Sequence, residues 1–240
     1  MLTGREERKM GRRIVRAALF MLFTINLLCL PAAAGGTEDN APMMALTFDD
    51  GPYSPVTNRI LDALEAVGGH ATFFVEGDRV AGCASVLRRS QALGCQTAIH
   101  TWDHTNFLTR RTAGEIQEEL EQCAQAVAEI TGETPTLVRP IGGVVNDDVC
   151  AAIESPIVLW SVDTRDWDTQ CADATVSAVL DTVQDGDIVL MHDLYPSTAE
   201  AVERLVPELT ARGYRLVTVE ELAAAKGIEL SPHTKYYHFH

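Results

Sequence analysis

Apolar runs of strand length alternate with amphipathic stretches along most of the chain. Two of the amphipathic stretches, residues 58–67 and 113–130, have apolar side chains three and four positions apart, which predicts helices. Seven runs are rich in apolar or β-branched residues and predict buried strands: 44–48, 71–75, 96–99, 136–138, 157–162, 187–191 and 215–219. Strands that alternate with helices predict a parallel sheet with helical crossovers.

Such a series of units can form a doubly wound open sheet or close into a barrel. No Gly-x-Gly-x-x-Gly sequence follows the first predicted strand, so a dinucleotide-binding fold has no positive support. We therefore predict an α/β barrel of seven strands. In either arrangement the carboxyl ends of the strands meet at one rim, where catalytic and binding residues are usually found.

The amino-terminal stretch differs in composition from the rest of the chain. Six Arg or Lys residues precede an apolar run over residues 17–30, and Pro31 and three alanines follow it. This is the layout of a secretory signal peptide, although the run is also close to the length of a membrane anchor. We assign residues 1–34 to a signal peptide or N-terminal membrane anchor and residues 35–42 to a linker. Either assignment predicts export, with the domain secreted or anchored on the outer face of the cytoplasmic membrane.

Composition and charge limit what the rest of the chain can be. Of the 240 residues, 46% are hydrophobic, which is enough to bury one large core in a domain of residues 43–228. The first 34 residues hold six basic and two acidic side chains, so 13 basic and 32 acidic ones remain, a net charge of −19. This charge repels phosphate backbones, so we expect no nucleic-acid partner. Residues 229–240 hold three histidines at no metal-binding spacing, and we expect a loose or surface-docked tail.

The five cysteines beyond the amino-terminal stretch leave their redox state open. No two of them form a Cys-x-x-Cys metal motif, and an odd number cannot all pair within one chain. An exported chain could pair Cys83 with Cys95 and Cys150 with Cys171. Buried thiols, including that of Cys123, are an equally good interpretation, because free cysteine packs as a small hydrophobe.

Two adjacent carboxylates end the first predicted strand. Asp49 and Asp50 follow the apolar run, and Gly51 and Pro52 then turn the chain. Like charges side by side repel and are costly to desolvate, so at the end of a core strand they need a cation or a proton-transfer task. The alternative is an ordinary acidic turn.

Two histidines four residues apart follow the third predicted strand. His100 and His104 can face the same way on a helical turn and reach one metal ion. Two surface histidines would explain the spacing alone more often, but a carboxylate pair at another strand end favours the metal. Two histidines and one carboxylate form a common catalytic site for zinc or a similar divalent ion. One aspartate would then ligate the ion, and the other would take a proton from water.

The sixth predicted strand ends in a third histidine. His192 could cap a core strand, or it could act as the general acid for a leaving group. Asp166 is a candidate to orient the imidazole and raise its proton affinity. The neighbouring Trp167 is either a core residue or a flat apolar wall of the kind on which sugars stack.

An arginine and two glycines follow the fourth predicted strand. A buried Arg139 must pair, and a carboxylate such as Asp49 would be held ionised by it. Gly142 and Gly143 would let backbone amides approach an oxyanion closely, although an ordinary loop turn explains them as well.

In this order, the sequences TFDDGP, HTWDH, RPIGG, DTRDW and LMHD resemble the five motifs of the polysaccharide deacetylase family. The resemblance extends from about residue 43 to residue 222, so the domain of residues 43–228 looks like the catalytic domain of that family. It implies a distorted (β/α) barrel of seven to eight parallel strands and a metal-dependent removal of acetyl groups from a glycan.

The resemblance also implies a role for each matching residue. Asp49 looks like the catalytic base, supported by Arg139, and His192 looks like the general acid, tuned by Asp166. The remaining matches are the metal ligands Asp50, His100 and His104, the wall residue Trp167, and Leu190, which corresponds to the leucine beside the acetyl methyl group.

One motif departs from the family pattern. The family usually has Arg-Pro-Pro-Tyr-Gly, in which the tyrosine amide donates to the oxyanion, whereas Ile141 and Gly142 stand where Pro and Tyr would. The amide donor remains at Gly142, but the aromatic side chain is lost. We expect the change to affect the grip on substrate rather than hydrolysis itself.

The function that this resemblance implies is removal of N-acetyl groups from an amino-sugar polysaccharide, peptidoglycan or a chitin-like oligomer. An O-acetyl esterase acting on acetylated xylan is the first alternative, and a glycan-binding module without catalysis is the second. We expect a divalent metal, with zinc first and cobalt or another transition metal next. The expected partner is the glycan substrate, and we expect a monomer.

Overall fold

The computed structural model describes residues 41–240, so the predicted signal peptide or anchor lies outside the described residues, as does nearly all of the linker. Within the described part, no helix combines the length and apolar character needed to cross a bilayer. The strands are β1 (Met43–Asp49), β2 (Thr72–Glu76), β3 (Gln96–Thr101), β4 (Ile157–Val158), β5 (Val162–Asp163), β6 (Ile188–His192), β7 (Arg215–Leu216) and β8 (Lys235–Tyr236). The helices are α1 (Ser54–Glu65), α2 (Gly77–Val80), α3 (Ala84–Ala92), α4 (Ala113–Thr131), α5 (Asp147–Ala152), α6 (Asp166–Thr169), α7 (Ala172–Leu180), α8 (Pro196–Ala211) and α9 (Val219–Ala225).

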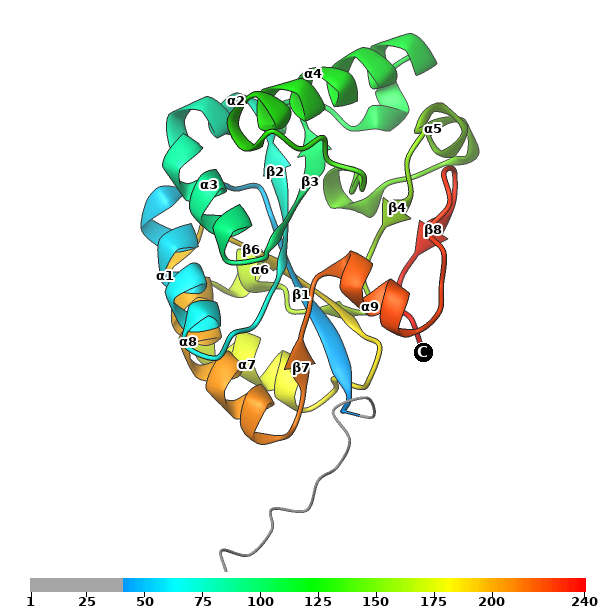
Figure 1. Ribbon diagram of the computed structural model, residues 1–240. Helices are drawn as coiled ribbons and strands as arrows, with labels where there is room; N and C mark the ends of the chain where they lie inside the picture. The colour runs from blue at the N-terminus through cyan, green and yellow to red at the C-terminus, as the bar shows by residue number, and fades with distance from the viewer. Residues whose placement is uncertain (1–40) are drawn as a thin grey trace, which may run out of the picture. The chain divides into compact units, whose positions relative to one another are not determined.

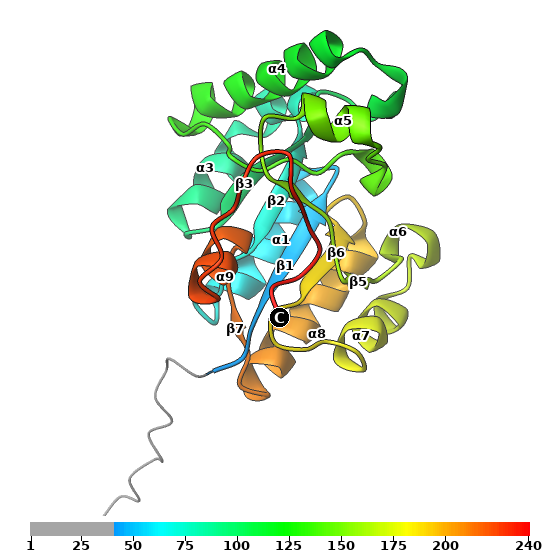
Figure 2. The same ribbon diagram turned by 90° about the vertical axis from the view of Figure 1, so that its right-hand side faces the viewer.

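Parallel strands form a central sheet in the order β3-β2-β1-β6-β5, and β7 pairs with the amino end of β1 (Figure 1). Helices α1, α3, α7 and α8 lie on one side of this sheet, and α9 and β8 lie on the other in both views (Figures 1 and 2). Val138 links β3 to β4 through parallel bridges to Ile99 and Ile157, and β4 pairs with β8. An antiparallel bridge from His238 to Asp187 then joins the chain to the start of β6. The predicted distorted barrel is confirmed.

The predicted strands differ in how far they form. Four of the seven runs become β1, β2, β3 and β6, and the two predicted helices become α1 and α4. The run 136–138 holds only the bridging Val138, and the run 157–162 splits into β4 and β5. The last run is strand only at residues 215–216, because the side chain of Thr218 accepts from the backbone of Glu221 and begins α9 with a capping box.

Alternate side chains of β1 point to opposite faces of the sheet and pack in two different apolar cores. Met44, Leu46 and Phe48 pack in the larger cluster with α1 and α8, whereas Ala45 belongs to a second cluster inside the barrel. Side chains two positions apart on a strand share a face, so Asp49 points to the same side as Ala45. The catalytic candidate therefore lies on the inner face of a strand that is buried from Met44 onward.

The carboxyl-terminal tail pairs with the rest of the fold, so of the two expectations, a loose or a surface-docked end, the loose end is wrong. Backbone N–H groups of β4 and the following residue donate to the tail, from Ile157 to the Thr234 carbonyl at 2.9 Å and from Leu159 to the Tyr236 carbonyl at 2.7 Å. Phe239 is 1% exposed and packs in the inner cluster. The tail therefore fills the space between β4 and β6.

The described cysteines are all free. The two candidate disulfides, Cys83 with Cys95 and Cys150 with Cys171, are therefore not formed. Cys95 and Cys123 are buried and act as small hydrophobic residues, as the other interpretation expects, but Cys83 and Cys150 are only partly buried and Cys171 is exposed.

Candidate active site

The inner faces of neighbouring strands bring the predicted residues to one rim. Asp49 ends β1 and lies opposite His192 of β6 in the parallel register. His100 is the penultimate residue of β3, two strands from β1. Asp50 has a left-handed backbone (φ 70), which turns its side chain away from the strand direction. The carboxyl ends of three strands therefore carry the candidate chemistry together.

Asp50, His100 and His104 form a group that fits a divalent metal ion. Their ligand atoms all lie within 4.8 Å of one another. Nε2 of His100 is 3.2 Å from Oδ1 of Asp50, and Nε2 of His104 is 3.7 Å from the same oxygen. That oxygen is buried and makes no hydrogen bond, an arrangement that a cation would satisfy.

The surroundings prepare this group for a cation. Nδ1 of His100 donates to the carbonyl oxygen of Arg139 at 2.7 Å, which leaves the lone pair of Nε2 facing Asp50. Burial alone would raise the pKa of Asp50, but the nearby imidazoles of His100, His192 and His104 lower it to about 2. The carboxylate is therefore ionised at neutral pH.

Arg139 holds the second carboxylate. Its guanidinium is completely buried, and Nη1 donates to Oδ1 of Asp49 at 2.7 Å and to Oγ1 of Thr47 at 2.8 Å. Nε and Nη2 donate to the carbonyl oxygens of Val158 and Leu159 at 2.9 and 3.0 Å. Burial lowers the pKa of Arg139, but the charge of Asp49 opposes this effect, and arginine stays charged. Asp49 is thus an oriented carboxylate beside a fixed positive charge.

His192 and Asp166 form the predicted pair. Nδ1 of His192 lies 2.7 Å from Oδ1 of the fully buried Asp166. The other oxygen of Asp166 accepts from the backbone N–H of His192 at 2.8 Å and from the Thr198 hydroxyl at 2.6 Å. Burial lowers the pKa of His192, but the hydrogen bond and charge of Asp166 outweigh it and raise the pKa to about 9. The imidazole is therefore protonated at neutral pH, as a general acid requires.

The remaining predicted residues lie near the same rim. Trp167 is the second residue of α6, next to Asp166, and is 48% exposed. Leu190 is buried opposite Thr47 in the register of β1 and β6. Gly142 is exposed in a 3₁₀ turn, Ile141–Gly143, with a left-handed backbone (φ 59) that suits glycine.

Sequence reasoning missed several supporting residues. Asp193 is buried, accepts from Oγ1 of Thr57 at 2.5 Å, and has a pKa raised to about 7, mainly by burial. Its carboxyl group packs against Gly51, where a Cβ atom would lie only 2.1 Å from Oδ1. Position 51 must therefore be glycine, because any side chain there would collide with the carboxyl group of Asp193. Thr198 was missed as well, because its contact with Asp166 spans 32 residues.

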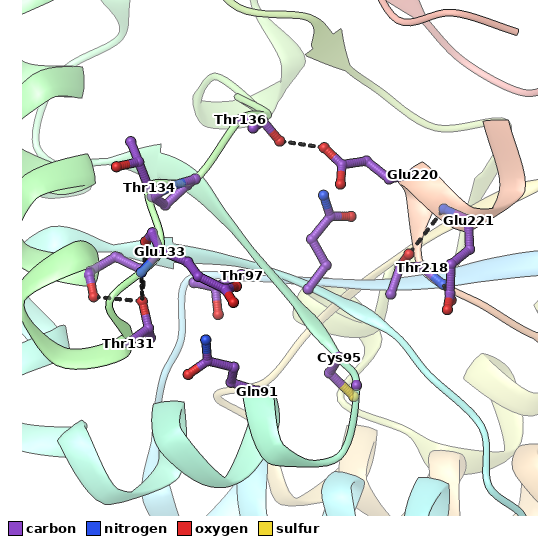
Figure 3. A pocket seen from close by; sticks show the side chains of 14 residues that line it. Gln91, Cys95, Thr97, Thr131, Glu133, Thr134, Thr136, Thr218, Glu220 and Glu221 are labelled. Atoms are coloured by element: carbon purple, nitrogen blue, oxygen red, sulfur yellow. Dashed lines mark hydrogen bonds between the residues drawn. The ribbon is translucent and has the colours of Figure 1, made fainter. Parts of the chain in front are cut away.

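A cavity of about 520 Å³ lies away from this site (Figure 3). Its lining includes Cys95 and Gln96 at the amino end of β3, and the hydroxyl of Thr136 donates to Glu220 across it. None of the predicted site residues lines it. The cavity lies at the ends of the strands opposite to the candidate chemistry.

Known proteins share this sequence and architecture. The sequence model of the family described as polysaccharide deacetylase matches residues 36–156. The peptidoglycan-N-acetylmuramic acid deacetylase PdaC of Bacillus subtilis is 38% identical over 79% of this chain. The peptidoglycan-N-acetylglucosamine deacetylase PgdA of Listeria monocytogenes is 40% identical over 76% of it. The chain spans about two fifths of the length of these two relatives, 40% and 39%.

Solved structures agree with the sequence relatives. The structure of PdaC superposes with a TM-score of 0.77 at 38% identity, covering 80% of this chain and 94% of that chain. A family 4 acetyl xylan esterase from Clostridium thermocellum, solved with a cobalt ion, has a TM-score of 0.77 at 30% identity, covering 82% and 98%. With its matching sequence model, relatives and fold, the chain belongs to the polysaccharide deacetylase family.

Proposed function

We propose that this domain is a metal-dependent hydrolase that removes N-acetyl groups from an amino-sugar polysaccharide. The observation that carries the proposal is the convergence, on one rim, of three metal-binding side chains with a charge-paired carboxylate and a protonated histidine. Metal, base and acid are the three parts that amide hydrolysis needs. A glycan-binding module would have no use for the Arg139–Asp49 and Asp166–His192 pairs.

The side chains of this chain divide the reaction between them. Asp49, held by Arg139, takes the proton of the attacking water. His192 gives its proton to the departing amine, and Asp166 keeps the imidazole oriented with its other nitrogen toward substrate. The backbone amide of Gly142 donates to the developing oxyanion, as the family resemblance implies. A divalent ion held by Asp50, His100 and His104 would supply Lewis-acid polarisation of the carbonyl and the water.

Peptidoglycan is the first choice of substrate, and a chitin-like oligomer is the second. The names of PdaC and PgdA support peptidoglycan, and a chitooligosaccharide deacetylase from a Bradyrhizobium strain, 34% identical over 74% of this chain, supports the second choice. A cell-wall substrate fits an exported protein, which we propose is either secreted or attached to the membrane through residues 1–34. We propose that it acts as a monomer. Zinc is the proposed ion, because two histidines and a carboxylate suit it.

A second candidate function is O-deacetylation of acetylated xylan. The similarity to the acetyl xylan esterase of Clostridium thermocellum supports it. An alkoxide is a better leaving group than the amide anion that would depart without protonation, so an ester needs less help from a general acid. Loss of His192 would therefore cost less activity on an ester than on an amide.

Acetate release from peptidoglycan, N-acetylglucosamine oligomers and acetylxylan tests the two functions with one purified protein. We expect release from the first two substrates, loss of release with a chelator, and recovery when zinc is returned. Faster release from acetylxylan than from either N-acetylated substrate would favour the esterase. Release that a chelator leaves unchanged would contradict the metal-dependent mechanism.

A further inference from the structure

The loop after β3 carries an aromatic side chain with no assigned role. Phe107 follows the proposed ligand His104 by three residues, and 39% of it is exposed. The next residue, Leu108, is 1% exposed and anchors the loop in the core. The exposed ring offers an apolar face on which a ligand could stack.

Phe107 occupies the space into which a side chain at position 142 would point. A Cβ atom built on Gly142 would lie 3.4 Å from Cε1 of Phe107 and 3.7 Å from Cγ2 of Val144. Val144 is also exposed, at 42%, so the two residues form an apolar patch beside the Gly142 backbone. The aromatic side chain that the Gly142 motif lacks is thus replaced by a ring from a different loop.

Strand order places this patch and Trp167 on opposite sides of the two aspartates. Phe107 follows β3 and Trp167 follows β5, while Asp49 ends β1 in the middle of the order β3-β2-β1-β6-β5. A single sugar bound at the aspartates cannot stack on two rings separated by several strands. An oligosaccharide that extends over the rim would contact both.

We infer that Phe107, with Val144, forms a stacking surface for a sugar unit next to the one that is deacetylated. The ring thereby sets a preference for oligomers over small acetylated compounds. This inference rests on the proposed function, because it concerns the same reaction and rim. Apolar ring faces of sugars stack on aromatic side chains, and contacts of this kind typically change KM by roughly three- to tenfold.

The test compares the parent protein with Phe107→Ala, Phe107→Tyr and Tyr237→Ala. Tyr237 is a matched control, because it is 48% exposed but belongs to the carboxyl-terminal tail. Acetate release from a pentamer of N-acetylglucosamine gives kcat and KM, and 4-nitrophenyl acetate reports hydrolysis of a compound too small to extend along the rim. Bound zinc is measured in every sample.

We expect Phe107→Ala to raise KM for the pentamer roughly three- to tenfold, with kcat within about twofold of the parent. Phe107→Tyr should restore the parent KM, and Tyr237→Ala should match the parent. Hydrolysis of 4-nitrophenyl acetate and zinc content should stay at parent values in Phe107→Ala. An unchanged KM for the pentamer, or an equal loss on both substrates, would overturn the inference. A parent protein that releases no acetate would refute the proposed function instead.

Discussion

Replacing Asp166 by asparagine should move the alkaline limb of the pH–rate profile to lower pH. The proposed acid His192 must be protonated, so activity is lost as pH rises through its pKa. With Asp166 in place that pKa is raised to about 9. The asparagine side chain would keep a polar partner but remove the negative charge, and the pKa should return toward its ordinary value of 6.5.

The size of the effect follows from the two pKa values. A return from about 9 to 6.5 removes roughly 3 kcal/mol of preference for the imidazolium. At pH 8 the protonated fraction would fall about thirtyfold, whereas at pH 6 it would fall less than about twofold. The penalty of Asp166→Asn should therefore grow with pH.

The assay is kcat/KM for acetate release from a soluble N-acetylglucosamine oligomer between pH 5.5 and about 9.5, at saturating zinc. Asp168→Asn is the matched control, because Asp168 lies two residues away in α6, is half-exposed and pairs with Arg165. Its profile should coincide with that of the parent. A uniform loss in Asp166→Asn at every pH, with the limb unmoved, would refute the assignment of His192 as the acid.

Three further outcomes follow from the same geometry. Arg139→Lys cannot donate to Asp49 and both strand carbonyls at once, so kcat/KM should fall about a hundredfold and urea unfolding should show a loss of about 3–5 kcal/mol. Phe239→Ala leaves a cavity inside the barrel and should cost about 3–5 kcal/mol in the same unfolding experiment, whereas a dispensable tail would cost almost nothing. A thiol reagent should label exposed Cys171 quickly but reach Cys123, whose pKa burial raises to about 12, only on unfolding.

The grouping of the candidate catalytic residues at one rim of the sheet could be predicted from sequence, because each of these side chains lies at the end of an apolar run. Asp49, His100 and His192 needed only the rule that carboxyl ends of parallel strands converge. Their partners Arg139 and Asp166 also follow predicted strands, but the groups that hold those partners in turn are remote in sequence and carry no local signal. The carbonyl groups that hold Arg139 belong to Val158 and Leu159, and any residue type has a carbonyl.

The same limit explains the errors in the fold. The run 157–162 looks like one strand, but Ile157 pairs with Val138 while Val162 pairs with Val189 of β6. Which strand each half of the run pairs with is decided by tertiary packing, and this leaves no trace in the run's own pattern of apolar residues. The docking of the tail was missed because it depends on Gly186, which is 53 residues before Phe239. A Cβ atom on Gly186, which has φ +97, would lie only 2.6 Å from the carbonyl oxygen of Phe239, so a larger residue there would exclude the tail.

The central claim is that the two adjacent carboxylates have different tasks. The most direct measurement determines bound zinc and acetate release in the same samples of the parent, Asp49→Asn and Asp50→Ala. We predict that Asp49→Asn keeps its zinc and loses a factor of about 10² to 10⁴ in kcat, the usual contribution of general base catalysis. Asp50→Ala should lose both zinc and activity. Parent-like acetate release by Asp49→Asn, or full zinc content in Asp50→Ala, would contradict the account.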